Sequence, residues 1–170
     1  MSLLIINAAT TCIEQVNHTV SLLKSCSADC HVMDMGSLRV EGCKGCYVCM
    51  LVTPGKCCIR DDGEELLRQI VQHDQVVFIF DTALNFINHK GINLINRMFP
   101  LVNMMLEPRC GEILHTPRYD AIPKIGFLYT GDADQDLINS WLMRVMVNYG
   151  AVSMGAMPLA DISEVCRWIS

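Results

Sequence analysis

The chain has 170 residues, a formal net charge of −5 and a hydrophobic fraction of 51%. This length suits one domain, residues 1–170, whose core is large enough to be stable without disulfides. The negative charge argues against binding to nucleic acid or to an anionic membrane surface, and no apolar run approaches the length of a membrane span. The apolar run at residues 3–6 lacks the length and the basic start of a signal peptide. We therefore expect a cytoplasmic protein whose ten cysteines are mostly reduced thiols or metal ligands.

The first third of the chain predicts a strand, a helix and a second strand. Residues 3–6 form a continuous apolar run of the kind found in buried parallel strands. A polar loop begins at residue 7, and apolar residues then repeat at helical spacing from Ile13 to Leu23. Residues 30–35 predict the second strand, which ends at Gly36.

A cysteine-rich insertion, at about residues 41–61, follows the second strand. Three cysteines stand three residues apart and a fourth follows eight residues later, namely Cys43, Cys46, Cys49 and Cys57. Pro54 and Gly55 predict a turn that brings the fourth cysteine back toward the others. Such spacing lets one loop wrap its thiolates around a soft metal ion or an iron–sulfur cluster, with Cys58 as a substitute ligand. Buried thiols and a structural zinc ion are the alternative interpretations.

The elements after the insertion continue the alternation. Asp62 to Glu65 has the pattern of a capping box, which starts a helix that runs to about residue 71. Residues 76–80 form the clearest strand, with five apolar residues. Residues 92–102 show helical spacing, and Pro100 is expected to kink or end that helix.

The last third of the chain predicts a loop, two strands and two helices. Residues 107–123 contain three prolines and no clean period, which indicates a long surface loop. A strand at 124–129 leads through Gly131 into a helix that stops at Gly150. A final strand is expected at 151–157. A final helix is expected at 161–169, with four residues facing inward, namely Ile162, Val165, Cys166 and Ile169.

This order of elements predicts an α/β protein. Five strands are each followed by a helix, except where the insertion follows the second strand. Such alternation implies a parallel sheet that is covered by helices on both faces. Ligands of these folds bind beyond the carboxyl ends of the strands, so the loops of interest are residues 7–19, 81–89 and 130–135.

The cysteine pattern and its continuation resemble a known family. The pattern is Cys43-x-Gly45-Cys46-x-x-Cys49, followed by Thr53-Pro54-Gly55-x-Cys57-x-x-x-Asp61-Asp62. It resembles the iron–sulfur flavoproteins and the related NAD(P)H-dependent FMN reductases of the flavodoxin-like superfamily. The likeness extends over roughly the first hundred residues, to the helix that carries Arg97. It implies a flavodoxin-like three-layer α/β/α fold with a five-stranded parallel sheet in the order 2-1-3-4-5.

The resemblance also implies a function and a set of site residues. It implies a homodimeric or homotetrameric oxidoreductase that passes electrons from NAD(P)H or a redox protein through FMN. In the cluster-bearing members, a 4Fe–4S cluster is held at the positions of Cys43, Cys46, Cys49 and Cys57. The residues expected to bind the FMN phosphate are Thr10, Thr11, Asn17 and Thr19. The residues expected at the flavin ring are Thr82, Ala83, Leu84, Asn85, Phe86, Thr130 and Gly131.

Two loops depart from the family pattern and motivate an alternative function. Relatives open with a Gly-Ser-Pro-Arg phosphate loop, whereas residues 8–11 here are Ala-Ala-Thr-Thr. The loop at residues 81–86 lacks the Pro-Val-Tyr that lies against the flavin ring in relatives. The alternative is a flavin-free protein of the same fold whose cysteine loop binds a structural metal or docks a partner.

Overall fold

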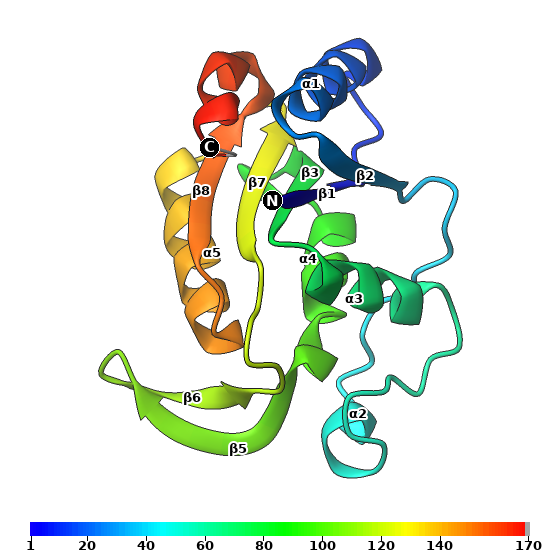
Figure 1. The fold of residues 1–170 in the computed structure, drawn as a ribbon, viewed down its shortest axis with the longest axis vertical. Coiled ribbons are helices and arrows are strands. Elements are labelled where there is room, and N and C mark those ends of the chain that lie inside the picture. Colours follow the sequence, from blue (N-terminus) through cyan, green and yellow to red (C-terminus); the bar gives the residue numbers. More distant parts are fainter. Residues whose placement is uncertain (169–170) are drawn as a thin grey trace.

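The computed structural model describes residues 1–168, and a parallel sheet lies at its centre (Figure 1). The five parallel strands are β1 (Ser2–Asn7), β2 (Asp29–Asp34), β3 (Gln75–Ala83), β7 (Lys124–Thr130) and β8 (Ser153–Pro158). They are ordered β2-β1-β3-β7-β8, which confirms the expected order 2-1-3-4-5. A short strand, β4 (Phe86–Ile87), turns back and pairs antiparallel with the end of β3.

Helices cover both faces of the sheet, because successive strand residues point to opposite sides. Leu3 and Ile5 pack in one core cluster with α1 (Ile13–Cys26) and with the 3-10 helix η2 (Leu159–Trp168). Leu4 and Ile6 pack in the other cluster. That cluster includes residues of three further helices, namely α3 (Gly63–Gln72), α4 (His89–Asn96) and α5 (Gln135–Tyr149). The three-layer, flavodoxin-like α/β fold is therefore confirmed.

The helix expected at residues 92–102 is shorter and starts earlier. It is α4, which begins after Asn88, whose side chain accepts a hydrogen bond from Gly91 N at 3.0 Å. A 3-10 turn, η1 (Phe99–Leu101), follows it and contains Pro100. The proline has no N–H for a continued α-helix, so the helix ends before it.

The surface loop expected at residues 107–123 is present only at residues 118–123, which contain no helix or strand. Residues 107–117 belong instead to a two-stranded antiparallel hairpin, β5 (Val102–Arg109) and β6 (Glu112–Pro117), which extends away from the sheet in Figure 1. Cys110 and Gly111 connect the strands with φ angles of 53° and 78°, as in a two-residue type I′ turn. The prolines argue against strands in this part of the sequence, so the hairpin was not predicted. Both strands of a two-stranded sheet are edge strands, however, and edge strands tolerate proline.

The last described element is a 3-10 helix and not an α-helix. The helix expected at residues 161–169 is η2, and Val165 is buried as expected. The side chains of Ile162 and Cys166, and all of Ile169, lie outside the described residues. None of the described helices is both long enough and apolar enough to cross a membrane.

Candidate functional site

The two ends of the cysteine insertion are tied together by a pair of neighbouring aspartates. Asp62 N donates to Arg39 O at 3.0 Å, and Arg39 N donates to Asp62 Oδ2 at 2.7 Å. Glu41 N donates to Asp61 Oδ2 at 2.8 Å, and Gly63 N donates to Asp61 Oδ1 at 3.0 Å. The Asp62 carboxylate thus binds Arg39 and does not cap α3 as the sequence pattern suggested. The insertion is a loop that is closed at its base.

A buried ion pair completes this closure. Arg97 Nη1 and Nη2 donate to the two oxygens of Asp61 at 2.7 Å each, and both side chains are 1% exposed. Arg97 Nη1 also donates to Glu41 O at 2.7 Å. Burial opposes ionisation of Asp61, but the hydrogen bonds from Arg97 and from two backbone amides lower its pKa to about 2. A Cβ at Gly63 would overlap the Arg97 guanidinium, so only glycine fits beside this pair.

All four predicted metal ligands line one pocket of about 230 Å³ in this loop. Its cysteines are Cys43, Cys46, Cys49, Cys57 and Cys58. The short helix α2 (Val48–Leu51) begins after Tyr47, whose φ of 57° lies in the left-handed region. Asn96, the last residue of α4, and Phe99 also line the pocket. The expected turn is also present, because Gly55 has a φ of 81° and donates its N–H to Cys49 O at 2.8 Å.

The thiols share this pocket without meeting at one point. Cys46 Sγ and Cys58 Sγ are 3.5 Å apart. Among the side chains that the structure describes, no three of His, Cys, Asp or Glu are arranged to hold one metal ion. The Val48 amide and then the Cys58 thiol lower the pKa of Cys46. Burial raises the pKa of Cys49, and the neighbouring Cys57 raises it further.

The carboxyl ends of β1, β3 and β7 meet at the side chain of Asp81. Thr10 donates its N–H and its hydroxyl to Asp81 Oδ2, both at 2.7 Å. Thr11 donates its N–H and its hydroxyl to Asp81 Oδ1 at 3.2 and 2.6 Å. Thr130 Oγ1 donates to the same oxygen at 2.8 Å. Burial opposes ionisation of Asp81, but these hydrogen bonds, led by those from Thr11 and Thr10, lower its pKa to about 2.

The residues expected at the flavin ring form a tight β-turn beside this cluster. Leu84 and Asn85 have φ angles of 52° and 64° and connect β3 to β4. Leu84 is fully exposed, and Phe86 packs edge-on against Trp141 with ring centroids 5.4 Å apart. Ala83, which pairs with Phe86, is exposed as well.

Thr82 links the turn to the loop after β7. Its hydroxyl donates to Thr130 O at 2.7 Å. A Cβ at Gly131 would lie 2.8 Å from that hydroxyl, and Gly131 has a φ of 75°. Thr82, Thr130 and Gly131 are therefore brought together with Thr10 and Thr11.

The other two residues expected at the phosphate lie elsewhere. Because α1 begins at Ile13, Asn17 and Thr19 are inside the helix. Asn17 is exposed, whereas Thr19 is 1% exposed and borders a shallow hollow near Leu159. Neither is among the described groups that bind Asp81.

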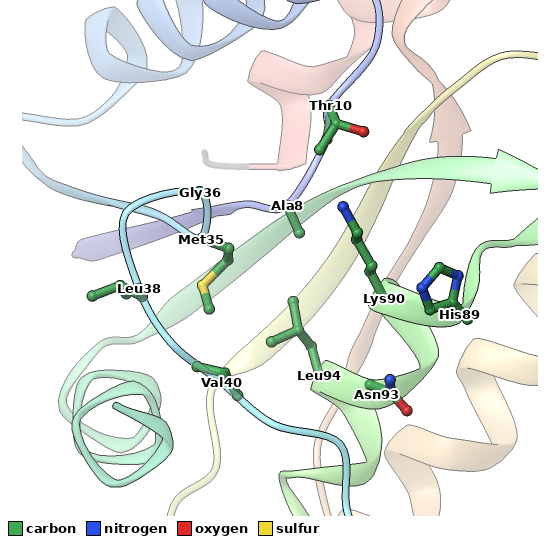
Figure 2. A pocket seen from close by; sticks show the side chains of 11 residues that line it. Ala8, Thr10, Met35, Gly36, Leu38, Val40, His89, Lys90, Asn93 and Leu94 are labelled. Atoms are coloured by element: carbon green, nitrogen blue, oxygen red, sulfur yellow. The ribbon is translucent and has the colours of Figure 1, made fainter. Parts of the chain in front are cut away.

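A second pocket, of about 270 Å³, lies between Thr10, the residues that follow β2 and the helix α4 (Figure 2). Met35 and Leu38, which follow β2, face α4 across it, and Figure 2 shows Lys90 rising from α4 toward the loop after β1. Its lining includes Ala8 and Ala9 but none of residues 82–86, 130 or 131. This pocket therefore shares only Thr10 with the expected flavin residues.

The two pockets border different parts of α4. The pocket beside Thr10 is lined by His89, Lys90, Asn93 and Leu94 of this helix. The cysteine pocket is lined by Asn96, the last residue of α4, and by Phe99. The cysteine pocket therefore lies beside the C-terminal end of α4.

Sequence reasoning did not identify Asp81 and Lys90 as site residues. Asp81 binds residues about 50 and 70 positions away, so no local pattern reveals its role. The available signal was its position at the end of the most apolar strand, where an acidic residue is unexpected unless it is hydrogen-bonded.

Comparison of the sequence with family models and with curated proteins finds no match. Solved structures with the same arrangement do exist. An NAD(P)H:quinone oxidoreductase from Methanothermobacter marburgensis is 18% identical, with a TM-score of 0.61, and 99% of this chain covers 90% of that protein. An azoreductase from Bacillus anthracis str. Sterne is 11% identical, with a TM-score of 0.62 and coverage of 99% and 93%.

A flavone reductase is 14% identical, with a TM-score of 0.60, and this chain spans 59% of its length. At these identities the likeness concerns the fold. The chain has the flavodoxin-like α/β fold, which it shares with these three enzymes.

Proposed function

We propose that this chain is an electron-transfer protein that holds a 4Fe–4S cluster in its cysteine pocket. The proposed ligands are Cys43, Cys46, Cys49 and Cys57. The observation that carries the proposal is the convergence of five cysteines on one pocket of about 230 Å³ in a loop closed by hydrogen bonds and a buried ion pair. Thiolates are the usual ligands of such clusters, and a bound cluster supplies one-electron transfer.

The spacing of the cysteines along the chain favours a cluster over a single zinc ion. Zinc loops more often divide into two Cys-x-x-Cys halves on separate turns. Here three cysteines stand three residues apart in one loop, and a fourth follows eight residues later. In a cluster each thiolate binds a different iron atom. Cys58, whose Sγ is 3.5 Å from that of Cys46, is the substitute ligand.

Flavin binding at the carboxyl edge is a second candidate. It is supported by the meeting of Thr10, Thr82 and Thr130 where parallel α/β folds bind ligands. The phosphate of FMN does not fit these residues as they stand, because the donors of Thr10 and Thr11 already bind Asp81. We therefore derive no reaction step through FMN.

The proposed electron donors are NAD(P)H and a redox protein, and the proposed assembly is a cytoplasmic homodimer or homotetramer. The hairpin supports self-association because four of its large apolar side chains are more than half exposed, namely Met104, Met105, Leu106 and Ile113. Contiguous exposed apolar side chains are typical of protein interfaces.

Replacement of single cysteines tests the cluster. Cys49→Ser is expected to lower the iron and sulfide content of protein purified without oxygen by more than half, because it removes a ligand. Cys110→Ser is the matched control, since Cys110 is a free, exposed cysteine at the tip of the hairpin. Iron retained in full by Cys49→Ser and Cys46→Ser, each shown to be folded by circular dichroism, would contradict the ligand assignment.

A further inference from the structure

The Asp81 carboxylate occupies the kind of position that a bound phosphate takes in other proteins. It accepts two backbone N–H groups and three hydroxyl groups, from Thr10, Thr11 and Thr130. Thr11 lies just before α1, and the N-terminus of a helix is a common binding site for anions. Phosphate oxygens use the same kinds of donors.

Several contacts fix Asp81 in this place. Its side chain is 4% exposed, and its backbone lies in β3, in register with Thr130. Asn88 N donates to Asp81 O at 3.0 Å from the other side. The start of the loop after β1 is fixed as well, because Ala8 N donates to Ile79 O at 2.9 Å. The backbones of Asp81 and Ala8 are therefore both held in place by hydrogen bonds.

The negative charge of Asp81 also opposes the binding of a phosphate at this position. No described ion pair includes Asp81, and the hydrogen bonds from Thr10, Thr11 and Thr130 stabilise its negative charge. A phosphate placed beside it would meet a second buried anion, and like charges at a few ångströms repel strongly in a partly buried site. The phosphate would also find its donors already used.

We propose that Asp81 is a specificity-determining residue that excludes phosphorylated ligands from the carboxyl edge. In this interpretation the edge binds an unphosphorylated flavin, such as riboflavin, in preference to FMN. The choice of a flavin as the probe rests on the second candidate function, whereas the exclusion of phosphate follows from Asp81 itself. A protein can gain specificity in this way, because a charge in the site repels one class of ligand and lowers its affinity.

Titration of the protein with FMN and with riboflavin, followed by flavin fluorescence, tests the proposal. The wild-type protein is expected to bind FMN no more tightly than riboflavin. Asp81→Ser removes the charge and frees the donors of Thr10 and Thr11, so FMN is expected to bind at least about tenfold tighter than riboflavin. Asp81→Asn, which keeps the size of the side chain, is the second variant if serine prevents folding.

Asp132→Asn is the matched control, because it makes the same change in charge on an exposed residue of the loop after β7. Its ratio of FMN to riboflavin affinity is expected to equal that of the wild type. A tenfold wild-type preference for FMN would overturn the proposal. So would an unchanged ratio in folded Asp81→Ser and Asp81→Asn, or an equal effect of Asp132→Asn.

The same titration separates this proposal from the function proposed above. If the wild type binds neither flavin, the flavin candidate fails, and the Asp81 variants still decide whether the carboxylate excludes phosphate. Iron content reports on the cysteine pocket independently of either result.

Discussion

At the scale of single residues, Asp61 and Asp81 are both buried carboxylates with hydrogen bonds to both oxygens. Asp61 is paired with Arg97, and the pair closes the cysteine insertion. Asp81 binds amides and hydroxyls and has no basic partner among the described ion pairs. Asp61 contributes an ion pair that closes the cysteine insertion, and Asp81 contributes hydrogen bonds that join the loop after β1 to β3 and β7.

The pH dependence of stability should reveal the hydrogen bonds of Asp81. A carboxylate with a lowered pKa in the folded state stabilises the fold above its unfolded pKa and loses this effect as the pH falls. For a shift from 3.8 to about 2, the effect is about 2 kcal/mol and disappears between about pH 4 and pH 2. Chemical unfolding at several pH values should therefore show a smaller acid-induced loss in Asp81→Asn than in the wild type. An identical loss in both proteins would contradict the assigned hydrogen bonds.

Gly63→Ala tests the close packing at the base of the insertion. The added Cβ would overlap the buried Arg97 guanidinium, so the free energy of unfolding should fall by about 1–3 kcal/mol. Gly36→Ala is the control, since its Cβ would meet only the Asp34 side chain, at 3.2 Å. Equal urea midpoints for Gly63→Ala and the wild type would show that the guanidinium is free to move.

At the scale of elements, the sequence predicts buried strands well and the hairpin poorly. Residues 76–80 are apolar without interruption, and β3 is buried over those positions on both faces. The hairpin was missed because its strands contain Pro108 and Pro117 and its turn places a cysteine in the left-handed region. The cysteine insertion was predicted from spacing, but its closure depends on Arg97, which lies more than 30 residues away in the chain.

A double-mutant cycle measures the closure of the insertion. Arg97→Met leaves Asp61 buried without its cation, which is expected to cost about 3–5 kcal/mol of unfolding free energy. Asp61→Leu combined with Arg97→Met should cost less than the sum of the two single changes, because no uncompensated charge remains. Additive effects in urea unfolding would exclude a direct interaction. The iron content of each folded variant shows whether the closure also shapes the cysteine pocket.

The exposed side chains of the hairpin test the proposed self-association. Met105 is 66% exposed on β5, and a charged residue there should oppose burial against a second copy of the chain. Sedimentation velocity is expected to show a smaller species for Met105→Asp than for the wild type. Met143→Asp, at an equally exposed position on α5, should leave the sedimentation coefficient unchanged. The same result for both variants would exclude the hairpin as the interface.

At the scale of the whole molecule, α4 connects two sites of different chemistry. Its start borders the pocket beside Thr10, and its end borders the cysteine pocket. The first pocket runs along residues 89–94 of this helix, and the second lies beside Asn96 at its end. Spacing along the chain could not predict this arrangement, because it depends on how α4 packs between the sheet and the insertion.

The most direct test is an absorbance spectrum of protein purified without oxygen, with iron, sulfide, zinc and flavin quantified in the same sample. The account predicts a brown protein that contains iron and sulfide in equal amounts and retains no stoichiometric FMN. A colourless protein that contains zinc would contradict the cluster. A yellow protein that holds FMN without iron would contradict both the cluster and the exclusion of phosphate by Asp81.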